Sequence, residues 1–165
     1  MAAIQAGQTA PLFSLPLLSG GQFALAEALG RGPVALAFFK ISCPVCQFAF
    51  PFLERIHKAA KGKDVTIVGV SQNTAADTTA FIREYGITFP VVLDDQRNYT
   101  VSNAYAITNV PTVFYVADDG EIEISSVGWS RADLEQIAKK IGERAHIGKI
   151  EVIRAGEEVP AFRAG

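Results

Sequence analysis

The spacing of apolar residues along the chain alternates between strand-like and helix-like stretches. Residues 33–39 and 65–70 are almost entirely apolar, which is typical of strands that are covered on both faces. Between them, residues 44–61 carry apolar side chains at spacings of three and four, as in an amphipathic helix. A strand, a helix and a second strand in this order predict a parallel pair joined by a right-handed crossover.

Similar patterns extend over the rest of the chain. Asn73 or Thr74 can cap a helix that Gly86 closes, and Ser130 can cap a last helix that Gly142 ends. The shorter predicted elements are a hairpin over 9–25, a helical turn at 26–29, a strand at 89–93, a helix at 97–106, a hairpin over 112–127 and an edge strand at 150–153. We therefore expect an α/β fold.

Size and composition predict one globular domain over residues 1–165, with a core at about 7–141 and a C-terminal extension at about 143–165. Apolar residues make up 49% of the chain and charged residues 19%, which excludes a disordered protein. The net charge of −2 predicts neither a nucleic-acid partner nor an electrostatic membrane anchor. No apolar run reaches the roughly 18–20 residues of a membrane helix and no signal peptide is apparent, so a cytoplasmic location is expected.

Both cysteines of the chain, Cys43 and Cys46, lie where the first apolar strand gives way to the first long helix. Unpaired N–H groups and the dipole at a helix N-terminus favour negative charge, so a thiol placed there loses its proton more readily. Cys43, at the edge of the helix, is therefore the predicted nucleophile, and Cys46, one turn further in, is the predicted resolving thiol. Two cysteines are too few to staple a secreted scaffold of this length, which favours a chemical role.

These features resemble the thioredoxin superfamily, most closely its redoxin/TlpA-like thiol–disulfide oxidoreductases, which are related to AhpC/TSA proteins. The resemblance covers residues 7–141 in the right order, and residues 74–106 are similar to an inserted βα element of the family. It implies a thioredoxin-like three-layer sandwich, with a central mixed β-sheet flanked by helices and an N-terminal β-hairpin extension. The matching segments are the opening 7–15, the strand into Cys43-Pro44-Val45-Cys46, Pro51, the loop 109–112 and the turn 127–129.

The resemblance also implies where a substrate binds. Pro111 would form a cis peptide beside the dithiol and leave the Val110 backbone free to pair with an extended substrate chain. Trp129 and Phe39 would form apolar walls beside Cys43, although burial in the core is the favoured alternative for Phe39. The implied redox group is the cysteine pair itself, with no cofactor.

Two positions depart from the family pattern. Members commonly carry Trp just before the first cysteine, where this chain has Ser42. Plain thioredoxin has a buried carboxylate on the preceding strand, and the matching residue here is Ala37, so the expected proton acceptor for Cys46 is missing. Lys40 is the nearest ionisable residue in the sequence, and its ammonium either stabilises the Cys43 thiolate or points to solvent.

A metal site is one alternative for the two thiols. A structural zinc needs four ligands, and the chain offers only two cysteines with His57 and His146. His57 lies eleven residues beyond Cys46, about 16 Å along a helix, so it can neither share a metal with both thiols nor act as their general base. No metal is therefore predicted.

A thiol peroxidase is the second alternative, because residues 89–92 and the opening hairpin also resemble peroxiredoxins. Their motif has Thr or Ser three residues before the reactive cysteine, whereas Cys43 precedes Cys46, and Lys40 precedes Cys43, at that distance. Neither position matches, but low-pKa thiolates do react with peroxide. A third alternative, a redox-inert interaction module, is disfavoured by the intact cysteine pair.

The sequence thus predicts an enzyme that exchanges disulfides, acting as a reductant. Cys43 attacks the substrate disulfide, and Cys46 then releases reduced substrate and leaves the pair oxidised. The expected partners are a disulfide-containing protein or small thiol substrate and an unidentified reducing partner.

Overall fold

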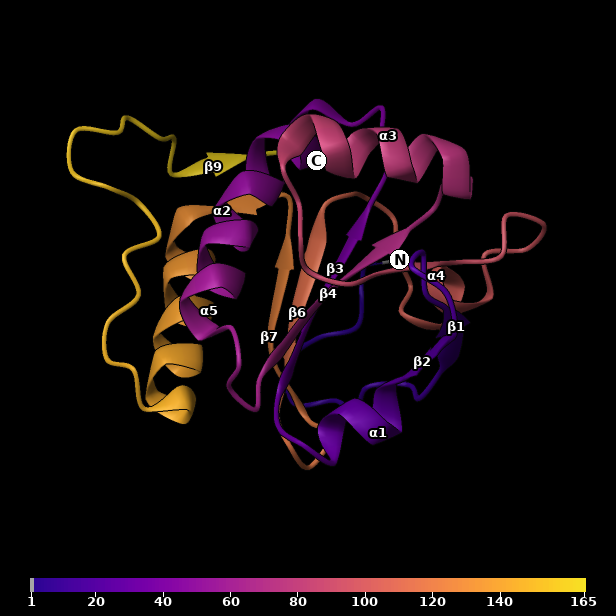
Figure 1. Cartoon of the computed structure of the whole chain (residues 1–165), viewed down its shortest axis with the longest axis horizontal. Coiled ribbons are helices and arrows are strands. Elements are labelled where there is room, and N and C mark those ends of the chain that lie inside the picture. The colour runs from indigo at the N-terminus through magenta and orange to yellow at the C-terminus, as the bar shows by residue number, and fades with distance from the viewer. Residues whose placement is uncertain (1) are drawn as a thin grey trace.

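The computed structural model describes residues 2–165 as three layers, with a five-stranded sheet between two sets of helices (Figure 1). This arrangement is the thioredoxin-like sandwich that the sequence predicts, and the N-terminal hairpin forms a separate two-stranded sheet. Among these residues, no helix is both long enough and apolar enough to cross a membrane. The elements follow in the order β1 (Ser14–Pro16), β2 (Gln22–Ala24), α1 (Leu25–Leu29), β3 (Val34–Phe39), α2 (Pro44–Ala60), β4 (Thr66–Ser71), α3 (Ala75–Tyr85), β5 (Val91–Leu93), α4 (Thr100–Ala104), β6 (Thr112–Val116), β7 (Ile122–Val127), β8 (Trp129–Ser130), α5 (Arg131–Ala145) and β9 (Phe162–Arg163).

The central sheet is mixed, with the strand order β5-β4-β3-β6-β7. β3 pairs in parallel with β4, as predicted, and antiparallel with β6. Because β3 and β6 run in opposite directions, the end of β3 lies beside the start of β6, where Phe38 pairs with Thr112. The loop that carries Cys43 and the loop that carries Pro111 therefore meet at one edge of the sheet.

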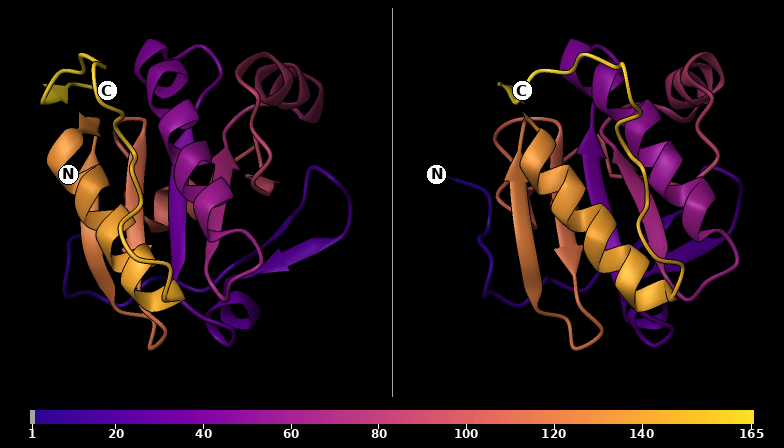
Figure 2. Two further views of the ribbon diagram at one scale, coloured as in Figure 1. Left: turned by 60° about the vertical axis from the view of Figure 1, so that its left-hand side comes forward. Right: turned by 90° about the vertical axis from the view of Figure 1, so that its left-hand side faces the viewer.

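The two faces of the sheet have separate hydrophobic cores, because alternate side chains of β3 point to opposite faces. Ala37 and its neighbours two positions away face α2, α3 and α5, whereas Leu36 and its neighbours face the hairpin, α1 and α4. Figure 2 shows α2 and α5 side by side over the first face. All of β3 is buried, which explains its uninterrupted apolar sequence.

The last helix continues past Gly142, so the prediction that it ends there is wrong. α5 ends at Ala145, and His146 takes the left-handed conformation, with φ of 56°, that closes it. The carbonyl of Gly148 packs against Gly142 and leaves no room for a Cβ atom. This glycine therefore admits the returning chain and does not terminate the helix.

Residues 146–165 turn back after α5 and run toward the N-terminal end of α2 (Figure 2). The edge strand predicted at 150–153 does not form. Ile150 and Val152 instead bury their side chains in the core that α2 and α5 share. The strand of this tail is β9, which pairs antiparallel with β8. The alternating apolar residues at 150–153 anchor an irregular segment.

Candidate functional site

Cys43 lies at the junction of β3 and α2 and is the N-cap residue of the helix. Its Sγ accepts a hydrogen bond from the backbone N–H of Cys46, with the two atoms 3.2 Å apart. Pro44 occupies the first helical turn, where its missing N–H has no cost. Because Cys43 is partly exposed, its sulfur is open to a substrate at a position where helical N–H groups favour an anion.

Cys46 lies one turn further into α2 and is fully buried. Burial raises the pKa of its thiol, and the hydrogen bond to the Cys43 side chain raises it further. Ala37 belongs to the same core cluster and brings no carboxylate to it. Glu54, a buried carboxylate of α2, instead accepts hydrogen bonds from residues 88–89. Cys46 therefore keeps its proton while Cys43 reacts.

The loop before β6 brings the Val110 backbone to Cys43. The Val110–Pro111 peptide bond is cis, as predicted. The Cys43 thiol donates a hydrogen bond to the Val110 carbonyl oxygen over 3.3 Å. The hydroxyl of Thr112 donates to the Asn109 carbonyl over 2.7 Å and closes the loop. Two of the predicted substrate-binding residues, Val110 and Pro111, thus lie in the loop that contacts the predicted nucleophile.

Phe39 has no exposed surface and packs within the core. Its ring centroid lies 4.4 Å from that of Phe50 and 5.1 Å from that of Phe81. The prediction that Phe39 forms a wall beside Cys43 is therefore wrong, because the last side chain of β3 points under α2 and α3. The alternative of core packing describes it correctly.

Trp129 is 2% exposed and forms part of an aromatic cluster at the N-terminal part of α2. Its ring centroid lies 4.8 Å from that of Phe48 and 5.0 Å from that of Phe52. The indole N–H donates a hydrogen bond to the Pro160 carbonyl over 2.7 Å. Trp129 therefore lies under the C-terminal tail and does not form an open wall.

Two side-chain amides hold the loop before Cys43. Asn73 Oδ1 accepts a hydrogen bond from the Ile41 N–H over 3.0 Å, and Gln47 Nε2 donates to the Ile41 carbonyl over 2.9 Å. Both polar groups of the Ile41 peptide are thus bound by side chains. Lys40 is exposed, as its solvent-facing alternative predicts, and its carbonyl accepts the N–H of Cys43.

Asn73 is a positioning residue that the sequence analysis does not predict. It was one of two candidate caps for α3, but the hydroxyl of Thr74 caps that helix by accepting the N–H of Asp77. The predicted parallel pairing of β3 and β4 could have indicated this role of Asn73. The carboxyl ends of parallel neighbouring strands lie at the same edge of a sheet. A polar residue two positions after β4 is therefore close to the loop that follows β3.

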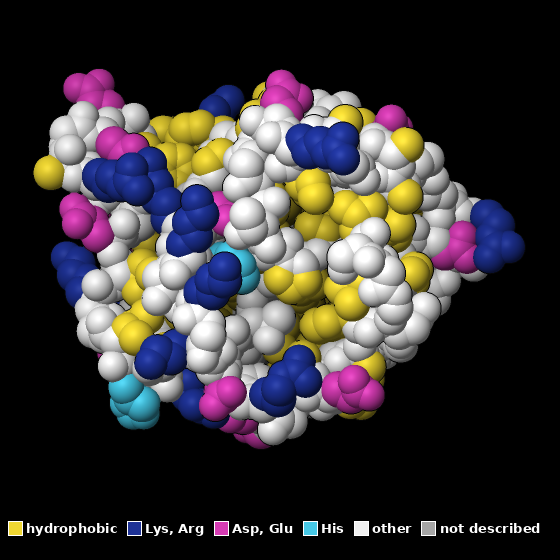
Figure 3. Space-filling view, in the orientation of Figure 1, with side chains coloured by type: hydrophobic (Ala, Val, Ile, Leu, Met, Phe, Trp, Pro, Cys, Tyr) yellow, Lys and Arg dark blue, Asp and Glu magenta, His cyan; other side chains and the backbone are white. Residues whose placement is uncertain are grey.

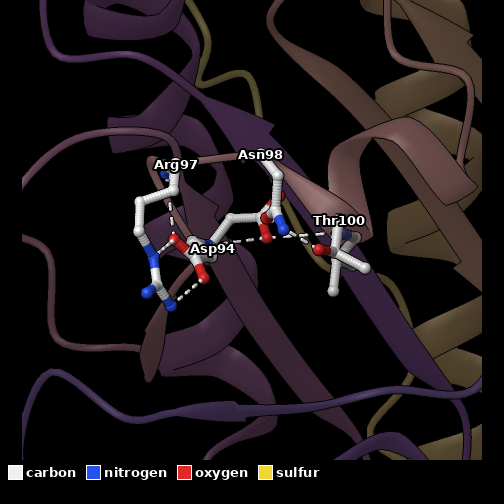
Figure 4. Close-up of polar contacts among 6 residues, drawn as sticks. Asp94, Arg97, Asn98 and Thr100 are labelled. Carbon is white, nitrogen blue, oxygen red and sulfur yellow. Dashed lines mark hydrogen bonds and ion pairs between the residues drawn. The ribbon is translucent and has the colours of Figure 1, made fainter.

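The aspartates at 94 and 95 have structural partners. Asp94 is buried, and its carboxylate accepts the N–H groups of Val101 and Ser102 over 3.2 and 2.8 Å. Figure 4 shows Asp94 and Arg97 together with Asn98 and Thr100. The Arg97 guanidinium binds Asp95 and lowers the pKa of that carboxyl to about 2. The helix α4 begins at Thr100, after Tyr99 in the left-handed conformation, and ends at Ala104, so it is shorter than the predicted 97–106. Both aspartates thus bind groups of α4 or of the segment that leads into it.

Within the part of the chain that the structure describes, no three or more His, Cys, Asp or Glu side chains are grouped so that they could hold a metal ion. His57 is partly buried beside Phe89, which lowers the pKa of its imidazole. The reactive groups that the fold brings together are the partly exposed sulfur of Cys43 and the buried sulfur of Cys46. A thiol pair one helical turn apart can capture a disulfide and then close a ring.

Comparisons with known proteins agree with this chemistry. The sequence profile of the AhpC/TSA family matches residues 6–125. The thiol-disulfide oxidoreductase ResA of Halalkalibacterium halodurans is 32% identical over 143 residues, which cover 86% of this chain and 80% of that protein. ResA of Bacillus subtilis is 33% identical over 121 residues, covering 73% and 66%. The thioredoxin domain of a thiol-disulfide oxidoreductase from Bacteroides vulgatus has a similar crystal structure, with a TM-score of 0.74, 26% identity and coverage of 84% and 98%.

Proposed function

This chain belongs to the AhpC/TSA family, and from that premise we propose that it reduces disulfides through Cys43 and Cys46. Relatives that are 32% and 33% identical are named as thiol-disulfide oxidoreductases. The observation that carries the proposal is the difference in solvent exposure between the two sulfurs. One is partly exposed at the start of α2, and the other is fully buried one turn away. This enzyme is an oxidoreductase whose redox group is its own cysteine pair.

The reaction begins when the Cys43 thiolate attacks one sulfur of a substrate disulfide. A new S–S bond joins Cys43 to the substrate, the substrate S–S bond breaks, and the other substrate sulfur leaves as a thiolate that takes up a proton. Cys46 then loses its proton and attacks the Cys43 sulfur. The second substrate sulfur leaves as a thiolate, so the substrate gains two electrons and the enzyme holds a Cys43–Cys46 disulfide.

The second step depends on how Cys46 loses its proton. The polar groups that shift the pKa of its thiol are the Cys43 side chain and the backbone of Lys40 and of Cys46 itself. None of these is a carboxylate, so the departing substrate thiolate or water is the proposed acceptor. Because burial raises the pKa of this thiol, we expect release to be slower than capture and the mixed disulfide to be long-lived.

The direction, the partners and the location complete the proposal. The substrate is a disulfide of a protein or of a small thiol, and a separate reducing partner restores the dithiol. We propose that the protein acts as a reductant in the cytoplasm, because thiols are kept reduced in that compartment. A measured reduction potential of the Cys43–Cys46 pair near that of cytoplasmic thiol pools supports this direction, and a strongly oxidising potential contradicts it.

Trapping the mixed disulfide tests the reaction. The variant Cys46→Ser captures a substrate disulfide but cannot release it, so mass spectrometry should find one substrate half bound to Cys43. The matched variant Cys43→Ser should form no such adduct. If Cys46→Ser turns over disulfide at the native rate, the roles of the two sulfurs are wrong. Rapid peroxide consumption that survives the loss of Cys43 would favour a thiol peroxidase instead.

A further inference from the structure

Residues 157–165, which we call the tail strap, lie along the flank of the dithiol. The strap reaches this place through β9, which adds to β8 near the start of α2 (Figure 1). The Trp129 indole N–H binds the Pro160 carbonyl over 2.7 Å, and the Arg131 N–H binds the Ala161 carbonyl over 3.0 Å. Figure 3 shows hydrophobic side chains gathered where the tail meets the upper part of α2. The strap therefore covers an apolar surface next to the site.

The strap also contacts the loop that holds the cis-proline. Gly165 packs against the Val110 carbonyl so closely that a Cβ atom has no room there. The Asn109 side-chain amide donates a hydrogen bond to the Gly165 carbonyl over 3.2 Å. The same Val110 oxygen accepts the hydrogen bond of the Cys43 thiol. The Val110 carbonyl thus binds the nucleophile and packs against the strap.

Gly128 lies between the cis-proline loop and the strap. Its N–H donates to the Pro111 carbonyl over 2.8 Å, and its Cα faces the backbone of Arg163 and Gly165 with no room for a side chain. The Arg163 guanidinium lies 5.2 Å above the ring of Phe48, at the edge of the aromatic cluster. The backbone space beside Val110 and Gly128, where an extended substrate would pair, is therefore occupied by this chain itself.

The contacts that hold the strap are of a kind that can open. Arg55 of α2 binds both carboxylate oxygens of Glu157 over 2.7 Å, but the side chains are 22% and 32% exposed. The pair is bidentate but only partly buried, so water and salt reach it and can compete with it. β9 adds only a two-residue strand, and the side chain of Phe162 is 60% exposed. Val159 packs against the core, whereas most of the other strap residues are exposed.

We propose that the tail strap decides which class of disulfide this site accepts. An extended polypeptide must displace the strap before it can pair with Val110, because both need the same backbone space. A compact disulfide of a small thiol reaches the partly exposed Cys43 sulfur while the strap is seated. In the seated state the enzyme therefore acts on small disulfides, and release of the strap admits polypeptides. This assignment rests on the proposed function.

Single-turnover kinetics test the assignment. The full chain and a variant that ends at Ala155 are reduced, freed of reductant and mixed with insulin or with hydroxyethyl disulfide. We expect removal of the strap to raise the rate constant for insulin about tenfold and to change that for the compact disulfide less than about twofold. A synthetic peptide of residues 156–165, added to the shortened protein, should slow insulin again and leave the compact disulfide unaffected.

A second variant protects the test against misfolding of the shortened chain. Glu157→Gln removes the charge that binds Arg55, whereas Glu158→Gln makes the same change at an exposed neighbour. Glu157→Gln should raise the insulin rate about two- to threefold and shift the emission of Trp129, the single tryptophan, while Glu158→Gln changes neither.

Three results would overturn the assignment. An insulin-to-compact rate ratio that stays the same in a folded, shortened protein shows that the strap is no barrier. A fall in both rates shows that the strap supports substrate binding. Failure of both disulfides to react with either form overturns the proposed function, and the assignment with it, and this pattern differs from an unchanged ratio.

Discussion

Two regions of the site differ in almost every property, although one turn of α2 joins them. The rim consists of Cys43, Val110 and the tail strap, and the floor consists of Cys46 and Ala37. The rim sulfur is partly exposed and bound to backbone groups, whereas the floor sulfur is fully buried among apolar side chains. Both sulfurs lie in the first turn of α2, where the helix dipole favours an anion, but packing of α2 on the sheet removes water from Cys46.

This difference assigns the two steps of the reaction to two places. Capture of a disulfide needs an accessible sulfur at a position that favours an anion, and the rim provides one at the N-cap of α2. Release needs a sulfur that stays protonated until the mixed disulfide has formed, and burial raises the pKa of Cys46 in that sense. Changes at the rim should therefore act on capture and on substrate choice, and changes at the floor on release.

Removal of the rim sulfur should have the largest effect. Cys43→Ser leaves only Cys46, whose thiolate fraction at neutral pH falls tenfold for each unit by which burial raises its pKa. We expect the rate of disulfide capture to fall at least about a thousandfold in stopped-flow measurements. Cys46→Ser should retain capture within about threefold, because it leaves the rim intact. Equal losses in the two variants would remove the distinction between rim and floor.

A carboxylate placed at the floor should speed release. Ala37→Asp puts a proton acceptor in the cluster that contains Cys46, so release at pH 7 should become about tenfold faster or more. Ala37→Asn has nearly the same shape and should not accelerate release. Both variants add a polar group to a fully buried site and should lower the free energy of unfolding by about 2–4 kcal/mol, measured in urea.

The pH dependence of release gives a further readout of the same variant. Because the pKa of Cys46 is raised, release by the native protein should accelerate about tenfold per pH unit above neutrality. Ala37→Asp should flatten this profile. A native profile that levels off near pH 7 would contradict a protonated floor.

Loosening the loop before the nucleophile should have an intermediate effect. Asn73→Ala frees the Ile41 N–H, and loss of this hydrogen bond should slow capture about three- to tenfold and lower stability by about 1 kcal/mol. Thr74→Ala removes the cap of α3 at a similar cost in stability, about 1 kcal/mol, and should leave capture unchanged. A stopped-flow comparison of the two variants separates positioning from general destabilisation.

Acid should loosen the strap, and this is the smallest of the expected effects. The Arg55 guanidinium lowers the pKa of Glu157 to about 2, below its ordinary 4.5. The pairing is therefore complete above pH 4.5 and is lost as the pH falls toward 2. Trp129 emission should follow this loss, and Glu157→Gln should remove that part of the transition. If Glu158→Gln removes it equally, the signal does not report the strap.

Local patterns were enough to predict much of the site. The apolar run of β3, the helical spacing of α2 and the two cysteines between them predict the dithiol at a helix start, because each depends on neighbours within one or two turns. The resemblance of residues 109–112 to the cis-proline loop predicts the second part of the site, which is the loop that contacts Cys43. The prediction that the last helix ends at Gly142 was wrong, because the sequence does not distinguish a glycine that ends a helix from one that makes room for a neighbouring backbone.

The sequence by itself determined the chemistry, namely which sulfur begins the helix and which follows it one turn later. Only the tertiary structure decided what surrounds that chemistry. It buried Phe39 in the core, brought Asn73 to the Ile41 peptide and laid residues 157–165 against Val110. The physical reason is the separation along the sequence of the residues that interact. Helix position is set by residues three or four apart, whereas packing joins groups tens of residues apart whose meeting depends on the order and direction of strands.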